Sequence, residues 1–195
     1  ALCERIAKAA GMCAYDVELA WLSGMLHDVG RFEQIKRYNT FSDADSVDHA
    51  KFGADLLFKD GLISTFLNGM VKCTGYKPGA LEDRYSSDGV FLYDRLNKSD
   101  MEMLELAIRC HNMYRIPQGL NRREQAFCNV LRDADKVDIF KVNIDTPLEE
   151  IYNTTTEELM KSDITDEVLE AFDEEHCILK AIRRTPADTV IGHVS

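Results

Sequence analysis

The apolar residues of this chain recur three and four positions apart, which is the spacing of one face of a helix. No Asn-Gly or Asp-Gly hairpin stands between runs of alternating polar and apolar residues, so nothing predicts a ladder of strands. We therefore expect an all-α fold. The predicted helices cover residues 1–10, 15–28, 31–38, 48–59, 62–70, 98–114, 121–143, 147–161 and 165–182.

The chain of 195 residues is long enough to bury one sizeable core, and we expect a single domain over residues 1–195. Its least regular stretch, residues 72–97, is rich in Gly, Pro and Ser, and we interpret it as a loop-rich excursion that covers or borders a site. The chemistry-bearing motifs lie within residues 1–143. Acidic amphipathic helices over 145–195 form a predicted extension that packs on the bundle or on a partner, which leaves a homodimer open.

The charge of the chain limits its partners. It has 23 Lys and Arg against 34 Asp and Glu, a net charge of -11, which opposes binding to long nucleic acids and to membrane surfaces. No apolar stretch is long enough to span a bilayer. The six cysteines are irregularly spaced without a CxxC pair, so we expect reduced thiols and a cytoplasmic protein.

Three histidines lie where the pattern predicts a buried helix face. The apolar run "ELAWLSGML" ends on His27 and Asp28, which places two ionisable groups at or near the core. His111 follows Leu104, Ala107 and Ile108 at helical spacing and shares their inward face, and His49 opens a helix in which Gly53 would allow close backbone approach.

The long helix from residue 121 adds carboxylates. Its apolar stripe runs from Phe127 to Val137; Asp138 falls inside the stripe, Asp135 lies at its edge and Asp133 points elsewhere. Each residue alone has a plain structural explanation, such as a hydrogen-bonded core histidine or a capping aspartate. Several unpaired polar groups on inward faces would be costly, however, and a shared cation removes that cost. Imidazole and carboxylate ligands therefore predict a metal site inside a helical bundle.

These residues resemble a known family. The His27-Asp28 pair followed by a distant "DADKVD" is similar to the pattern of the HD-domain superfamily of metal-dependent phosphohydrolases. The segments "HDVGR", "DHAKFGADLL", "CHNMYRIPQGL" and "RDADKVDIF" also resemble an uncharacterised bacterial branch of that superfamily, so the resemblance covers roughly residues 1–143. It implies an HD-domain helical bundle that binds divalent metal.

The resemblance also implies roles for individual residues. His27 and Asp28 would be ligands, with Asp28 able to bridge two ions, and Asp135 would be the late ligand. His49 and His111 match the histidines that complete a second metal, so we expect one or two divalent ions chosen from Mn, Mg, Co, Ni, Zn and Fe. The family's first histidine would fall before Ala1, so we expect a trimmed N-terminus and weakened metal binding in this form; a natural loss would favour a degenerate domain.

Basic residues near these ligands are candidates for substrate contact. Arg31 follows the HD pair by three positions and could hold a substrate phosphate in a bidentate contact; its alternative is a surface ion pair. Lys51 and Arg115 follow candidate histidines closely and are weaker candidates, because surface solvation explains both. Asp133 and Asp138 are candidates for supporting or substrate-binding positions.

The function implied is that of a phosphohydrolase. We expect hydrolysis of a phosphomonoester or phosphodiester in a nucleotide or another small phosphorylated substrate, through a metal-activated water, with Asp28 and Arg31 at the reacting group. Two alternatives stay open. One is an HD-type di-iron oxygenase, and the other is a non-catalytic regulatory domain that binds a metal or ligand.

Overall fold

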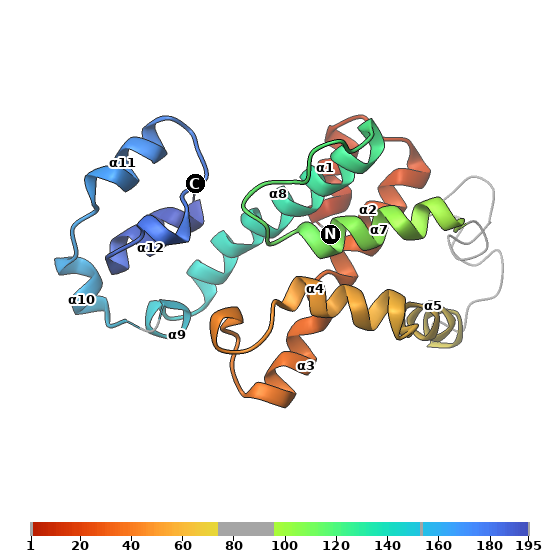
Figure 1. Ribbon diagram of the computed structural model, residues 1–195, viewed down its shortest axis with the longest axis horizontal. Coiled ribbons are helices and arrows are strands. Elements are labelled where there is room, and N and C mark those ends of the chain that lie inside the picture. Colours follow the sequence, from red (N-terminus) through yellow and green to blue (C-terminus); the bar gives the residue numbers. More distant parts are fainter. Residues whose placement is uncertain (1, 74–95, 153, 195) are drawn as a thin grey trace. The chain divides into compact units, whose positions relative to one another are not determined.

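The computed structural model describes residues 2–73, 96–152 and 154–194 (Figure 1). Over these residues the chain is helical and has no strand, which confirms the all-α prediction. It divides into two compact units, Ala1–Ala134 and Asp135–Ser195, and the boundary falls within one long helix.

The first unit contains the helices on which the predicted histidines lie. Its elements are α1 (Leu2–Ala9), α2 (Ala14–Leu26), α3 (Val29–Tyr38), the 3-10 turn η1 (Asp43–Asp45), α4 (His49–Ala54), the π-helical segment η2 (Asp55–Lys59), α5 (Leu62–Cys73), α7 (Lys98–Cys110) and the start of α8 (Arg122–Asp145). The predicted helix over 48–59 is thus α-helical at first and then π-helical. Most of the predicted excursion at 72–97 lies outside the described residues.

The core of the first unit forms where α2, α7 and α8 place apolar side chains at helical spacing. Leu19 and Leu22 of α2, Leu104 and Ile108 of α7, and Phe127 of α8 are completely buried. Contacts of α1 with α2, of α4 with α7 and of α3 with α4 attach α1, α3 and α4 to this centre. The ends of α2 and α7 therefore lie beside a well-buried apolar core.

A buried carboxylate connects three of these helices. Asp100 of α7 is inaccessible to solvent; it accepts a hydrogen bond from the Tyr15 hydroxyl at 2.6 Å and pairs with Arg123 at 2.8 Å. Arg123 also contacts Asp16 at 2.7 Å. Asp100 accepts from the backbone N–H of Asn97, and the Asn97 side chain accepts from the backbone N–H of Asp100, so Asn97 caps α7. The same carboxylate thus caps one helix and holds two others.

We expect Tyr15→Phe to lower the free energy of unfolding by about 2 kcal/mol, because the substitution removes a hydrogen bond to a charged, buried acceptor. Urea denaturation monitored by circular dichroism would measure the change. Tyr114→Phe is the matched control, since Tyr114 is 40% exposed. Equal stability of the two variants would contradict this role of Tyr15.

The second unit consists of shorter helices after the end of α8. They are α9 (Leu148–Tyr152), α10 (Thr156–Lys161), α11 (Asp166–Asp173), the 3-10 turn η3 (Lys180–Ile182) and α12 (Pro186–Val194). The predicted helix over 147–161 is divided because Thr155 and Glu158 form a capping box that starts α10. The helix predicted over 165–182 is shorter than expected: α11 ends at Asp173, because the backbone of Glu175 is left-handed.

Buried Asp188 organises the second unit. Its carboxylate accepts hydrogen bonds from the backbone N–H groups of Thr165, Arg184 and Thr185 at 2.9, 2.8 and 3.1 Å. Burial opposes ionisation, but these bonds outweigh it and hold the pKa of Asp188 below its ordinary value. The carboxylate thereby fixes the residues that precede both α11 and α12.

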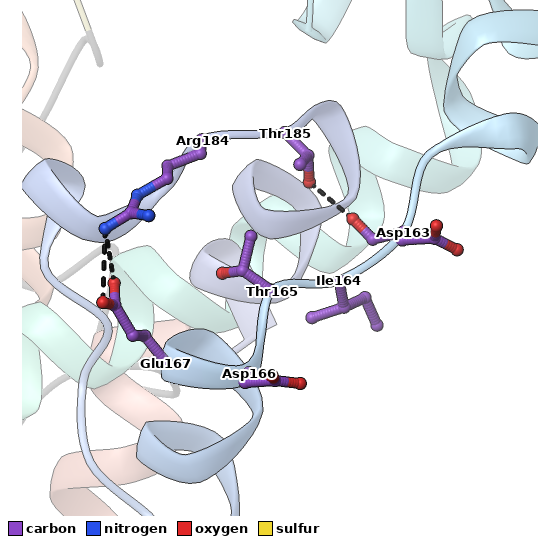
Figure 2. Close-up of a pocket in the computed structure, with 7 residues that line it drawn as sticks. All are labelled: Asp163, Ile164, Thr165, Asp166, Glu167, Arg184 and Thr185. Carbon is purple, nitrogen blue, oxygen red and sulfur yellow. Dashed lines mark hydrogen bonds and ion pairs between the residues drawn. The ribbon is translucent and has the colours of Figure 1, made fainter.

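A shallow pocket of about 400 Å³ lies beside these turns (Figure 2). Arg184 pairs with Glu167 at 2.9 Å, and the Thr185 hydroxyl donates to the backbone carbonyl of Asp163. The pocket is lined by Asp163, Ile164, Thr165, Asp166, Glu167, Arg184 and Thr185. Because these include no histidine or cysteine, the pocket has none of the imidazole ligands that the sequence predicts for a metal site.

Candidate metal centre

The HD pair occupies the junction between two helices. α2 ends at Leu26 and α3 begins at Val29, so His27 caps the first helix and Asp28 caps the second. The His27 ring lies with Nδ1 at 2.9 Å from the carbonyl oxygen of Gly24. A carbonyl only accepts, so Nδ1 carries the hydrogen and Nε2 of the neutral ring is an acceptor.

His111 is held in the same way at the end of α7. It caps this helix, and its Nδ1 donates to the carbonyl oxygen of Ile108 at 2.7 Å. Carbonyls in the last turn of a helix lack partners within the helix, so a histidine placed there satisfies one of them and is itself oriented. The His111 side chain is only 1% exposed.

His49 reaches the site because two glycines let α3 and α4 touch. A Cβ at Gly30 would lie 2.2 Å from the carbonyl oxygen of His49 and 2.8 Å from the backbone N of Gly53. A Cβ at Gly53 would lie 3.0 Å from the backbone N of Gly30. The close approach predicted from Gly53 is therefore confirmed, and Gly30 is the more tightly packed of the two glycines.

The imidazole and carboxylate groups converge on a small volume. His49 Nε2 lies 3.1 Å from His111 Nε2, and Asp28 Oδ1 lies 3.5 Å from the first and 3.7 Å from the second. His27 Nε2 lies 3.7 Å from Asp28 Oδ2. Ligand atoms of His27, Asp28 and His111 all lie within 4.8 Å of one another, as a shared metal ion requires.

This arrangement fits a cation. The Nδ1 of His49 contacts Asp43 at 2.7 Å, so all three rings use Nδ1 as the donor and turn Nε2 inward. Asp28 Oδ1 is buried and accepts no hydrogen bond within the part of the chain that the structure describes. In a tetrahedral site with metal–nitrogen bonds of about 2.1 Å, two ligand atoms lie about 3.4 Å apart, which is close to the distances between these acceptors. A metal ion would compensate these facing acceptors, and a shared proton would do so only in part.

Arg31 is engaged by groups that the sequence did not single out. Its Nη1 donates to the carbonyl oxygen of Phe41 at 2.7 Å and to Asp43 and Gln34 at 3.0 Å each. Glu33, an acid two positions after Arg31, pairs with Lys36 and Arg37. These contacts give Arg31 a structural role, and its contact with a phosphate stays a prediction.

Asp43, Gln34 and Gly30 were missed because no periodic signal marks them. Asp43 lies in the short turn η1 six residues before His49, where a sequence shows only a polar loop. Burial opposes the ionisation of Asp43, but hydrogen bonds from Gln34 and His49 outweigh it and hold the pKa of Asp43 below its ordinary value. A run of Asp and Ser just before a helix that opens on histidine was the available signal.

The other predicted residues lie on α4, on α8 and in the segment between α7 and α8. Asp135 is the first residue of the second unit and is partly buried, so its role as the late ligand stays a prediction. Asp133 and Asp138 are exposed, and Val137 is 44% exposed, so the predicted stripe ends before Asp138. Lys51 is exposed and pairs with Asp48 at 2.8 Å, and Arg115 is exposed with its guanidinium over the Tyr114 ring.

Asp48 caps the helix that carries His49. It accepts from the Lys51 ammonium at 2.8 Å, from the backbone N–H of Lys51 and from Asn112 at 2.9 Å. Burial opposes the ionisation of Asp48, but these bonds, that with the Lys51 side chain first, outweigh it and lower the pKa of Asp48 to about 2. A folded-state pKa below the ordinary 3.8 stabilises the fold above about pH 4, and this contribution is lost as pH falls toward 2.

We therefore expect Asp48→Asn, which keeps a capping side chain, to be less stable than the parent protein at about pH 6 and equally stable near about pH 2. Urea unfolding at both pH values would measure the difference in free energy. Asp60→Asn serves as the control because Asp60 is exposed. If the difference in free energy of unfolding between Asp48→Asn and the parent protein were the same at both pH values, the role assigned to the Asp48 charge would be contradicted.

Comparison with known proteins agrees with this geometry. The family model described as HD domain matches residues 1–140, which include every residue of the group described above. Searches of curated proteins and of solved structures found no match. No described helix is long and apolar enough to cross a membrane. HD domains bind divalent metals and are generally hydrolytic. The match spans more than half of the chain, and the protein belongs to the HD domain family.

Proposed function

We propose that this protein is a metal-dependent phosphohydrolase that acts on a small phosphoester. One observation carries the proposal: three acceptor atoms, His49 Nε2, His111 Nε2 and Asp28 Oδ1, lie within 3.7 Å of one another. The Nδ1 atoms of both rings donate to groups outside this cluster, so their Nε2 atoms are left to accept. His27, Asp28 and His111 would hold a divalent ion, with His49 beside them and Asp135 as a further ligand. The ion supplies Lewis acidity toward a phosphoryl oxygen and toward a water nucleophile.

The exposure of the residues favours access from one side. The side chains of His49 and His111 are 6% and 1% exposed, whereas that of Asp28 is 46% exposed. The buried histidines therefore exclude water from the inner side, and a substrate would approach Asp28 from the outer side. This arrangement orients a phosphoryl group without requiring a serine or cysteine nucleophile.

The charge of the chain favours a small substrate. A net charge of -11 repels long polyanions, while a locally bound cation attracts a single phosphoryl group. We therefore propose a nucleotide or another small phosphoester as the substrate. Arg31, 28% exposed and 3.8 Å from Asp28 Oδ1, is close enough to take part in its orientation.

The test is metal content followed by hydrolysis. The full-length protein, purified without chelators, should retain Mn, Co, Ni or Zn by elemental analysis and should hydrolyse p-nitrophenyl phosphate or its bis-ester. Activity should disappear with a chelator and return with the metal. Iron accompanied by dioxygen consumption would favour the oxygenase instead, and absence of metal after reconstitution would favour a regulatory domain; either result would overturn the proposal.

A further inference from the structure

His49 differs from the other two histidines in the group that it contacts. His27 and His111 donate to backbone carbonyls, whereas His49 Nδ1 lies 2.7 and 2.9 Å from the two carboxylate oxygens of Asp43. We propose that Asp43 is a positioning residue that holds His49 in the Nδ1–H tautomer, so that the Nε2 lone pair faces the metal site. The inference rests on the proposed function only for the consequence of that tautomer.

Asp43 is itself fixed from the opposite side by a buried amide. Gln34 is completely buried, and its Nε2 lies 2.9 Å from Asp43 Oδ1, 2.9 Å from Ser46 Oγ and 3.0 Å from the carbonyl oxygen of Val47. Its Oε1 accepts from Arg31 Nη1, which fixes the orientation of the amide. A carboxylate held in this way cannot rotate away from His49 without leaving buried donors unpaired.

Arg31 completes the support. Its Nη1 donates to Asp43 Oδ1 at 3.0 Å and to the carbonyl oxygen of Phe41, which joins α3 to the turn that carries Asp43. Arg31 and Gln34 therefore both donate to Oδ1, whereas Oδ2 accepts only a longer contact, 3.4 Å, from the Asn112 amide and makes the shorter contact with His49. A carboxylate that accepts from a histidine also raises the basicity of the other ring nitrogen, which strengthens a metal ligand.

This division of the two oxygens predicts an unusual result for an isosteric substitution. In Asp43→Asn the two close donors, Arg31 and Gln34, outweigh the more distant Asn112 and select the amide oxygen at the Oδ1 position, so the NH2 group faces His49 Nδ1. The amide then donates, and His49 must carry its hydrogen on Nε2, within 3.5 Å of Asp28 Oδ1. The variant stays folded, but the ring no longer offers a lone pair to the site.

Nitrogen NMR of the metal-free protein tests the tautomer directly. With 15N-labelled histidine at about pH 8, where imidazole is neutral, the parent protein should show His49 as the Nδ1–H tautomer. Asp43→Asn should convert it to Nε2–H, while His27 and His111 stay as Nδ1–H and serve as internal controls. An unchanged His49 in Asp43→Asn, or Nε2–H in the parent, would overturn the inference.

Competition with a chromophoric chelator would measure the Zn²⁺ affinity, which shows how the His49 tautomer affects metal binding. Affinity should fall about 10- to 100-fold in Asp43→Ala, which removes the orienting group, and further in Asp43→Asn, which presents the wrong tautomer. A purely structural role predicts the opposite order, because Asn preserves the shape of Asp, and that order would overturn the inference. If the parent binds no metal, the proposed function fails, while the NMR result still decides the tautomer.

Discussion

Asp28→Ala should abolish the retention of metal without lowering the stability of the metal-free protein. The carboxylate supplies an oxygen that is buried and accepts no hydrogen bond from the described residues, so the folded state gains little from it when no ion is bound. With an ion at one hundred times its dissociation constant, the parent protein should gain about 2.7 kcal/mol of stability. The variant should gain none.

Thermal unfolding with and without the metal identified by elemental analysis would measure both effects. Asp60→Ala is the matched control, because it removes one exposed carboxylate and makes the same change in net charge. Hydrolysis should fall to background in Asp28→Ala and stay at the parental level in Asp60→Ala. Metal-dependent stabilisation that survives in Asp28→Ala would remove Asp28 from the ligand set.

Gly30→Ala should destabilise the protein by about 3 kcal/mol, although alanine is the better helix former. The new Cβ would lie 2.2 Å from the carbonyl oxygen of His49, and both this atom and the backbone N of Gly53 belong to the backbone of α4 rather than to a flexible side chain. α3 and α4 must then separate, which moves His49 away from Asp28. Stability and metal affinity should therefore fall together.

Gly53→Ala provides a graded comparison for the same interface. Its Cβ would lie 3.0 Å from the nearest backbone atom, so a small shift accommodates it, and we expect a loss of about 1 kcal/mol or less. Denaturant unfolding of both variants, with Zn²⁺ titration of each, would rank them. A Gly30→Ala protein as stable as the parent would show that α3 and α4 do not pack as described.

The fold was predictable where periodicity and local capping agree. The all-α class follows from spacing alone. Asn121 followed three residues later by Glu124 is a capping pattern, and at the start of α8 the side chain of each accepts from the backbone N–H of the other. The helix α12 was missed because its defining contacts are distant: Asp188 bonds to Thr165, which lies 23 residues earlier. Spacing within a segment carries no information about such a partner.

The candidate site, like the fold, was predictable only where the signal is local in sequence. Inward-facing histidines identified His27, His49 and His111, because a buried imidazole is conspicuous on an apolar face. Asp43 gave no such signal, since its role depends on a turn that brings it back to His49. The exposure of Asp138 also differs from the helical-wheel prediction, because the wheel assumes that the apolar stripe continues to the end of α8.

His27, Asp28, His49 and His111 all stand at helix ends, where local opening costs the least free energy. An ion bound by all four residues would need every one of these ends closed at the same time. Apparent affinity is then the intrinsic affinity multiplied by the fraction of molecules in which no end is frayed. The metal affinity of this protein would therefore depend on how often its helix ends fray. A substitution that strengthens a capping hydrogen bond would then raise the affinity without changing any ligand.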